Sequence, residues 1–296
     1  METEESGELV VKSNRLIEAS YRLTLVESQM ILFAITQARE SAVMLRADTT
    51  VSIDALAFAK QFDVSPDNAY GQLQEAALTL FNRYVVVNDT HPKTGKPRVV
   101  RSRWISDAAY VEGAGIVELS FTKKVIPYVT RLEQQFTSYR LASVSRMTSA
   151  YAVRVYELLT QYARIGERKF ELAELKKMLG LEEEYKLIHD FKVRVLDVAV
   201  KQINKHSDLK VSYSQKKKGR VVTQIIFAIH PKDAKPTKPA KPAKPVQLGL
   251  NGVEPATKSD DPTVLANREK ALVAARVKPK KPTVDTEYDP VSDAPI

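Results

Sequence analysis

The segment from 170 to 229 carries the pattern that most restricts the fold: a short helix, a turn, a long amphipathic helix and a β-hairpin. Gly180 is placed to end the short helix, because glycine readily adopts the left-handed conformation found just beyond many helices. Two runs rich in β-branched residues flank the basic turn 216–220 and predict the hairpin. This order of elements predicts a winged helix, in which a β-hairpin follows a helix-turn-helix.

The charge of this segment indicates what it binds. Between Tyr185 and Arg220 there are ten Lys or Arg residues and three Asp residues, a surplus of +7. Residues 1–143 hold 16 basic and 17 acidic residues, so the positive charge is local. Clustered cations on a long helix and the hairpin beside it favour binding to the phosphates of DNA.

The long helix, predicted over 186–206, has an apolar face and a polar face. The apolar stripe consists of Ile188, Phe191, Val195, Val198 and Ile203. The other face carries Lys186, Asp190, Val193, Arg194, Asp197, Lys201 and Asn204. We therefore expect one face to pack on the core while the other enters the major groove.

Arg194 is the residue that we expect to read a base, because a guanidinium can hold O6 and N7 of guanine together. Lys186, Lys192 and Lys201 suit phosphates, which need only a point charge. The alternative interpretation is a solvated lysine-rich helix. The adjoining turn and hairpin favour the DNA-reading interpretation.

The hairpin turn is the predicted wing. Lys216, Lys217, Lys218 and Arg220 are expected to contact DNA, because four cations at one tip repel one another unless an anion is near. Gly219 allows the positive φ that a tight hairpin needs. The alternative is that surface lysines at a hairpin tip only protect a sheet edge from aggregation.

The first half of the chain repeats the plan with less charge. Thr24 and Glu27 form the sequence pattern of a capping box, which predicts a helix that begins there. Further helices are expected over 54–61 and 68–83, and strands over 98–111 and 115–122. The predicted DNA contacts of this half are Asn68, Gln72 and Arg83 on its long helix, and Lys93, Lys96 and Arg98 in a basic wing over 91–103.

These patterns predict an α+β chain of two tandem winged-helix domains. We expect a flexible N-terminus (1–8), a first domain (9–134), a second domain that is the main DNA reader (135–230), and a disordered tail (231–296). Eleven of the fifteen prolines lie between Pro231 and Pro295, so the tail has little apolar surface to offset the entropy of ordering. Its Lys-Pro repeat favours an extended polyproline II spacer.

The composition excludes several classes of site. The chain has no cysteine, its four histidines lack the spacing of metal ligands, and no phosphate-binding glycine loop is present. We therefore expect no metal, no cofactor and no enzymatic activity. The N-terminus has no signal-peptide pattern, and no apolar run is long enough to span a bilayer. The expected location is the cytoplasm, with no membrane contact.

Four long segments, 9–35, 67–87, 117–159 and 191–227, resemble the iteron-binding plasmid replication initiators, the Rep family with two winged-helix domains. The resemblance implies a protein that binds direct repeats (iterons) at a plasmid origin and opens adjacent A·T-rich DNA. It implies recruitment of the host DnaA initiator and the replicative helicase. It also implies copy-number control, in which the monomer activates the origin and a homodimer, formed largely through the first domain, represses the protein's own operator.

Three further hypotheses stay open at this point. In the tail, Gln247, Leu248 and Leu250 resemble the short peptides that bind bacterial sliding clamps, although Asn251 stands where such peptides usually have Phe. A winged-helix transcriptional repressor with no part in replication needs the same DNA-facing surfaces. A nicking enzyme needs a catalytic Tyr beside a His cluster, and the sequence has no such cluster.

Overall fold

The computed structural model describes residues 8–40, 45–91, 93–111, 113–130 and 135–232, all within one compact unit, Met1–Lys238. The expectations for residues 1–7 and for the tail from 233 onward, including the clamp-type peptide, lie outside the described residues.

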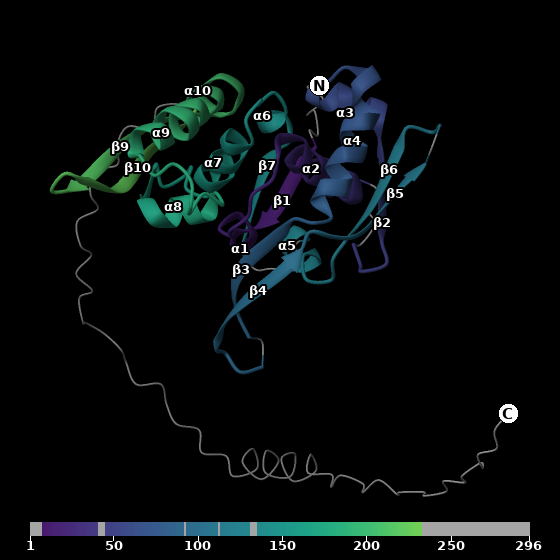
Figure 1. Cartoon of the computed structure of the whole chain (residues 1–296), viewed down its shortest axis with the longest axis horizontal. Coiled ribbons are helices and arrows are strands. Elements are labelled where there is room, and N and C mark those ends of the chain that lie inside the picture. The colour runs from purple at the N-terminus through teal and green to yellow at the C-terminus, as the bar shows by residue number, and fades with distance from the viewer. Residues whose placement is uncertain (1–7, 41–44, 92, 112, 131–134, 233–296) are drawn as a thin grey trace, which may run out of the picture. The chain divides into compact units, whose positions relative to one another are not determined.

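The first half of the fold contains helices α1–α5 and strands β1–β6 (Figure 1). They are β1 (Leu9–Ser13), α1 (Asn14–Ile17), α2 (Leu25–Glu40), β2 (Thr50–Asp54), α3 (Ala55–Phe62), α4 (Pro66–Leu80), β3 (Tyr84–Thr90), β4 (Pro97–Arg103), β5 (Ile105–Val111), β6 (Ile116–Phe121) and α5 (Ile126–Val129). Strands β2, β6 and β5 form an antiparallel sheet in that order, while β3 and β4 form a separate hairpin.

The second half repeats the arrangement after a short connection. It contains β7 (Phe136–Arg140), α6 (Ala142–Ser145), α7 (Ala150–Thr160), β8 (Glu167–Glu171), α8 (Leu172–Met178), the long helix α9–η1–α10 (Ile188–Phe191, Lys192–Leu196, Asp197–His206), β9 (Leu209–Lys218) and β10 (Val221–Pro231). Its sheet order is β8-β10-β9. The prediction of two tandem winged-helix domains is confirmed.

The start of α2 follows from its cap. The backbone N–H of Thr24 donates to Glu27 Oε2 at 2.6 Å, and the backbone N–H of Glu27 donates to Thr24 Oγ1 at 3.2 Å. The predicted capping box is therefore confirmed. Beyond it, α2 is buried on nearly all sides, including Met30–Ile35, because other elements of the domain pack around it.

The long helix of the second domain differs from the predicted regular helix, because its central turn, η1, is π-helical. The buried side chains Phe191, Val195, Ala199 and Ile203 follow at intervals of four residues. In a regular α-helix each such step turns the face by about 40°. A wider π turn reduces that drift, so the four side chains stay on the core. Val198, expected in the buried stripe, is only partly buried.

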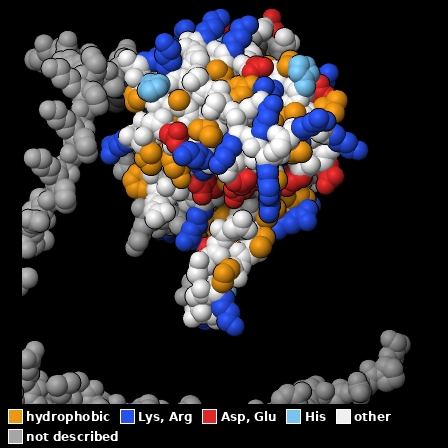
Figure 2. All heavy atoms as spheres, turned by 90° about the vertical axis from the view of Figure 1, so that its left-hand side faces the viewer, with side chains coloured by type: hydrophobic (Ala, Val, Ile, Leu, Met, Phe, Trp, Pro, Cys, Tyr) orange, Lys and Arg blue, Asp and Glu red, His pale blue; other side chains and the backbone are white. Residues whose placement is uncertain are grey.

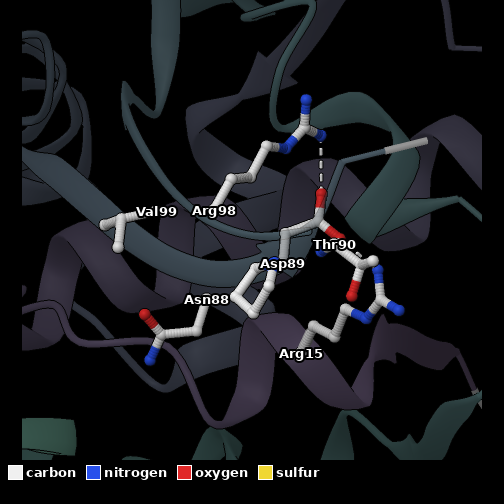
Figure 3. Close-up of a pocket in the computed structure, with 7 residues that line it drawn as sticks. Arg15, Asn88, Asp89, Thr90, Arg98 and Val99 are labelled. Atoms are coloured by element: carbon white, nitrogen blue, oxygen red, sulfur yellow. Dashed lines mark hydrogen bonds and ion pairs between the residues drawn. The ribbon is translucent and has the colours of Figure 1, made fainter. Parts of the chain in front are cut away.

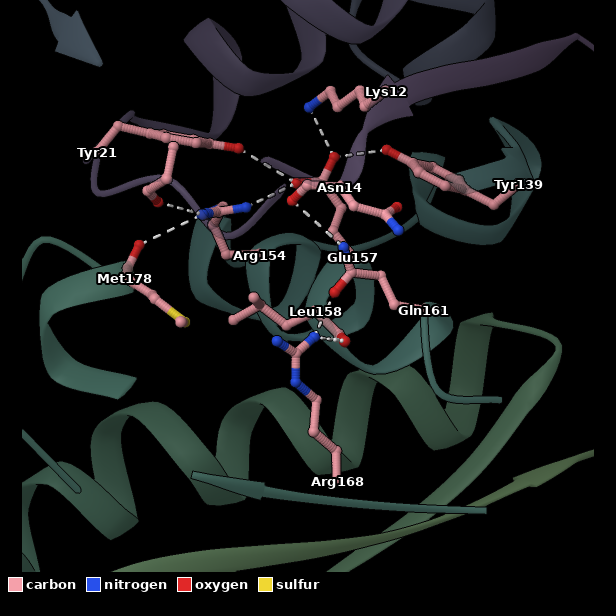
Figure 4. Close-up of polar contacts among 11 residues, drawn as sticks. Lys12, Asn14, Tyr21, Tyr139, Arg154, Glu157, Leu158, Gln161, Arg168 and Met178 are labelled. Carbon is pink, nitrogen blue, oxygen red and sulfur yellow. Dashed lines mark hydrogen bonds and ion pairs between the residues drawn. The ribbon is translucent and has the colours of Figure 1, made fainter. Parts of the chain in front are cut away.

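A buried polar cluster connects β1, β7 and α7 (Figure 4). Glu157, with its side chain 1% exposed, accepts from Lys12 Nζ at 2.6 Å, from the Tyr139 hydroxyl at 2.6 Å and from Arg154 Nη1 at 3.1 Å. Burial alone raises the pKa of Glu157, but Lys12 and Arg154 hold it below its usual value. The carboxylate thus stays ionised inside the protein.

This cluster crosses the expected boundary between 134 and 135. Strand β1, at the start of the chain, pairs antiparallel with β7, from Leu9 opposite Arg140 to Ser13 opposite Phe136. The two winged helices are consequently joined by backbone pairing as well as by buried charge. The exact boundary between them stays a prediction.

Candidate nucleic-acid interface

The polar face of the long helix is built as a reading surface. The helix begins at Ile188, so Lys186 lies just before it rather than on it. Lys186, Arg194 and Lys201 are exposed, and Lys192 is half-buried. Within the described residues, none of these four side chains forms a hydrogen bond or an ion pair. The cations are therefore free to meet an external anion. Val193, between Lys192 and Arg194, is 47% exposed and adds an apolar contact to the same surface.

Two acids close to this surface are held by tyrosines rather than by lysines. The Tyr213 hydroxyl donates to Asp197 Oδ1 at 2.6 Å, and the Tyr156 hydroxyl donates to Asp208 Oδ1 at 2.8 Å. Burial and the neighbouring Asp197 carboxylate raise the pKa of Tyr213, so its hydroxyl remains a donor at neutral pH. The fold thus fixes the two carboxylates without neutralising the nearby cations.

The wing is the tip of the β9–β10 hairpin. Lys216, Lys217, Lys218 and Arg220 are all exposed there. Gly219 has φ 63°, the left-handed conformation that the predicted tight turn requires. Figure 2 faces this side of the molecule and shows Lys and Arg side chains spread over it, with a band of acidic side chains across the middle.

In the first domain, α4 occupies the place of the reading helix. Asn68 is exposed near its N-terminus and Gln72, one turn later, is half-buried. Pro66 stands in the first turn, where a missing N–H costs no hydrogen bond. Asn68 and Gln72 therefore stay candidates for DNA contact.

Arg83 has an internal role that its sequence position does not reveal. Its Nε donates to Glu27 Oε1 at 2.9 Å and to Oε2 at 3.2 Å, and the side chain of Glu27 is fully buried. A buried carboxylate needs a cationic partner. The structure thus argues against the expectation that Arg83 faces DNA.

Arg98 is likewise paired inside the protein (Figure 3). Its Nη2 donates to Asp89 Oδ2 at 2.6 Å, while Arg15 pairs with the other oxygen of Asp89 and the Tyr128 hydroxyl donates to Oδ2 at 3.1 Å. Burial opposes ionisation of Asp89, but these partners hold its pKa below the usual value. Arg98 therefore joins β4 to Asp89 of β3 next to the hairpin turn, and its predicted DNA contact stays a prediction.

The assignment of 91–103 as the first domain's wing is also wrong in topology. In each domain the strand before the second helix pairs with the last strand of a hairpin, β2 with β6 and β8 with β10. The equivalent of the β9–β10 wing is therefore β5–β6. The basic segment instead lies in the β3–β4 hairpin, which projects in a different direction (Figure 1).

Lys93 and Lys96 are nevertheless exposed near the tip of that extra hairpin. On its outer face Arg101 lies 4.7 Å from the centre of the Tyr84 ring, and Arg103 lies 4.7 Å from the centre of the Phe81 ring. Stacking on a ring orders a guanidinium while leaving its N–H groups available. The hairpin therefore presents ordered cations along one side.

The described residues contain no group of three or more metal-binding side chains placed to hold an ion. Among the same residues, no helix combines the length and apolarity needed to cross a bilayer.

Comparison with known proteins places these features in a family. A family model described as "Initiator Replication protein, WH1" matches residues 9–160, and one described as "Initiator Rep protein, WH2" matches residues 171–229. The chain belongs to this family of replication initiators. The first match extends through β7, α6 and α7, and the second covers β8 to β10. The resemblance found in the sequence is confirmed.

Individual proteins are similar over about three quarters of this chain. A replication initiation protein of Escherichia coli is 30% identical over 233 residues, which cover 75% of this chain and 70% of the relative. An uncharacterized 27.6 kDa protein of Escherichia coli is 28% identical over 231 residues, which cover 75% of this chain and 95% of the relative. The crystal structure of Pi initiator protein in complex with iteron DNA shares the fold, with a TM-score of 0.58 and 19% identity over 76% of this chain and 98% of that one.

Proposed function

We propose that this protein is a DNA-binding initiator of plasmid replication that binds direct repeats at its origin. The observation that carries the proposal is the array of cations along the reading helix and wing of the second domain, whose side chains pair with no residue that the structure describes. Family membership supports it, and so does the shared fold with Pi initiator protein, which is bound to iteron DNA in its crystal structure.

In the proposed complex the polar face of α9–η1–α10 enters the major groove. Arg194 holds a guanine through O6 and N7, while Lys186, Lys192 and Lys201 contact flanking phosphates. The wing residues 216–220 contact the backbone beside that groove. Burial of the opposite helix face fixes the orientation of the reading side chains.

The first domain contributes the second half of the binding site. Asn68 and Gln72 on α4 face the adjacent major groove, and Lys93 and Lys96 approach the backbone from the tip of β3–β4. This contact is weaker than that of the second domain, because Asp67 and Glu75 lie on the same helix.

The finer functions that we propose come from the family. The bound protein opens A·T-rich DNA and recruits the host DnaA initiator and the replicative helicase in the bacterial cytoplasm, with no chemical step of its own. A homodimer in equilibrium with the monomer represses its own operator. A further proposal comes from the sequence of the tail and not from the family: the peptide at 247–250, which resembles clamp-binding peptides, contacts a sliding clamp.

A replication assay separates this function from that of a repressor with the same fold. A plasmid that carries the origin and its repeats is introduced into cells with and without an intact copy of this gene. We expect replication only with the gene. An origin that replicates equally well without it contradicts the initiator function and favours the repressor.

A further inference from the structure

A basic groove lies between the two winged helices, at α3, α6 and the C-terminal part of α10. It consists of two adjoining hollows of about 420 Å³ each, which share Arg146 and His206 in their walls. Helix α6 contacts both α3 and α10 and lies between them (Figure 1). We call this feature the junction groove.

The charge of the junction groove is strongly positive. Its walls contain Lys60, Arg146, Lys201 and Lys205, against the single acid Asp63 among the described lining residues. All four cations are exposed, and none forms a hydrogen bond or ion pair with another residue that the structure describes. Like charges gathered without counter-charges favour an anion from outside the protein.

The pKa of His206 is consistent with a positive electrostatic potential in the groove. Burial, and then the nearby charges of Lys205, Arg146 and Lys232, lower the pKa of this imidazole. No acid contributes to the shift. The groove is therefore positive even where the imidazole itself is neutral.

The groove has an ordered floor. Gln202 Oε1 accepts from the backbone N–H of Thr148 at 2.8 Å and from that of Ser149 at 3.2 Å, which ties α10 to the start of α7. Lys232 Nζ donates to the carbonyl oxygens of Asn204 at 2.8 Å and Ser207 at 2.5 Å, which closes the C-terminal end of α10. The cations thus project from a fixed base.

The position of the groove indicates its ligand. Lys201 follows Arg194 along the exposed side of the long helix, so the groove continues the reading surface of the second domain. On the other side, Lys60 and Asp63 lie just before α4, the reading helix of the first domain. A duplex read by both helices presents, between its two major grooves, a minor groove bordered by two sugar-phosphate strands.

We propose that the junction groove binds the phosphodiester backbone of DNA between the two major grooves. This proposal rests on the proposed function and adds to it a third contact, made mainly by Arg146 and Lys205 with support from Lys60. An open groove lined by separated cations suits a chain of phosphates, whereas a compact ligand needs a closed and largely apolar pocket. The contact carries no base specificity, and it sets the distance between the two reading helices.

The test combines alanine variants of the protein with a DNA duplex whose central phosphates are replaced by neutral groups. The variant Arg146→Ala/Lys205→Ala removes two exposed cations, and Lys123→Ala/Lys124→Ala removes two exposed cations outside the groove as a matched control. The probes are a duplex with one direct repeat from the replicon that carries the gene, the same duplex with neutral methylphosphonates at its central positions, and a shuffled duplex. Circular dichroism checks that each variant is folded.

We expect the groove variant to bind the repeat and the shuffled duplex about tenfold more weakly, and to lower the slope of log affinity against log salt by about two. Central methylphosphonates weaken the wild type and the control variant, but have little further effect on the groove variant. The proposal is overturned if the groove variant keeps the wild-type affinity and salt slope, or if the methylphosphonates weaken every protein equally. The preference of the wild type for the repeat over the shuffled duplex tests the proposed function separately. If that preference is absent, the proposed function fails, whatever the groove variant does.

Discussion

At the scale of single residues, exposure and partners divide the arginines of this chain into two groups. Arg194 and Arg220 are exposed, and neither side chain pairs with a described residue. Arg83 and Arg98 each pair with a carboxylate of low exposure, Glu27 or Asp89. Helix periodicity predicts the exposure of Arg194, and the hairpin turn predicts that of Arg220. Sequence reasoning did not show these pairs, because the partner of Arg83 lies 56 residues away and that of Arg98 lies on the neighbouring strand, 9 residues away, where the strand register decides the contact.

Arg194 and Lys217 are predicted to affect DNA binding differently. Arg194→Ala should cost about 1–3 kcal/mol on the repeat and relax the preference at one base pair. Lys217→Ala should weaken binding to all sequences alike and lower the salt slope by about one. Affinity measured on the repeat, its single-base variants and a shuffled duplex checks both. Equal losses on specific and shuffled DNA for both variants contradict the division of roles.

Glu157 is predicted to be a large contributor to stability. Replacement by Gln leaves Lys12 and Arg154 buried without their counter-charge, so Glu157→Gln should lower the free energy of unfolding by about 3–5 kcal/mol. Urea unfolding measures this, and Glu174→Gln, at an exposed position on α8, is the matched control. A loss no greater than that of the control contradicts the ionised state of Glu157.

The same carboxylate predicts a dependence on pH. Its pKa is lower in the folded protein than the ordinary value of 4.5. Its contribution is therefore complete above pH 4.5 and is lost as the pH falls below 4.5 towards the folded pKa. Urea unfolding from pH 6 to the acid range should show a steeper loss of stability for the wild type than for Glu157→Gln. Parallel curves contradict the shift.

At the scale of elements, local rules predicted helices and caps well but not the identity of the first wing. The capping box at Thr24 and the turn at Gly219 need only neighbouring residues, and both are present. Two hairpins follow α4 in succession, β3–β4 and β5–β6, and strand patterns do not show which of them pairs with β2. Sequence patterns also did not predict the π turn of the long helix, because that turn depends on how Val195 and Ala199 pack on the core.

Gly180 and Gly219 form a matched pair for a prediction at this scale. Both have a left-handed φ, 65° and 63°. A Cβ at Gly180 would lie 2.8 Å from Arg22 Cβ and 3.2 Å from the Tyr21 backbone, whereas nothing lies within 4 Å at Gly219. Both Ala variants should lose about 1 kcal/mol through strain. Gly180→Ala should lose more, because α8 must also move from the segment at Tyr21. Thermal unfolding of both variants measures the difference, and equal losses contradict the close approach.

At the scale of the whole molecule, the features that join the two domains come from residues far apart in the chain. Lys12 meets Glu157, and Lys60 shares the junction groove with Arg146 and Lys205. No local sequence pattern predicts these contacts between residues that are distant in the chain. The long matching segments predicted the family and the two-domain plan, because they cover both folded halves, whereas only the three-dimensional arrangement reveals the groove between them.

The central claim is that two winged helices grip a duplex through free cations and read its sequence. Fluorescence anisotropy of the wild type on one direct repeat and on a shuffled duplex, over a series of salt concentrations, tests it most directly. The account predicts binding to the repeat at least about a thousandfold tighter, and a slope of log affinity against log salt of about −5 to −9, as expected for roughly 6–10 neutralised phosphates. Equal affinity for the two duplexes, or affinity that does not change with salt, contradicts it.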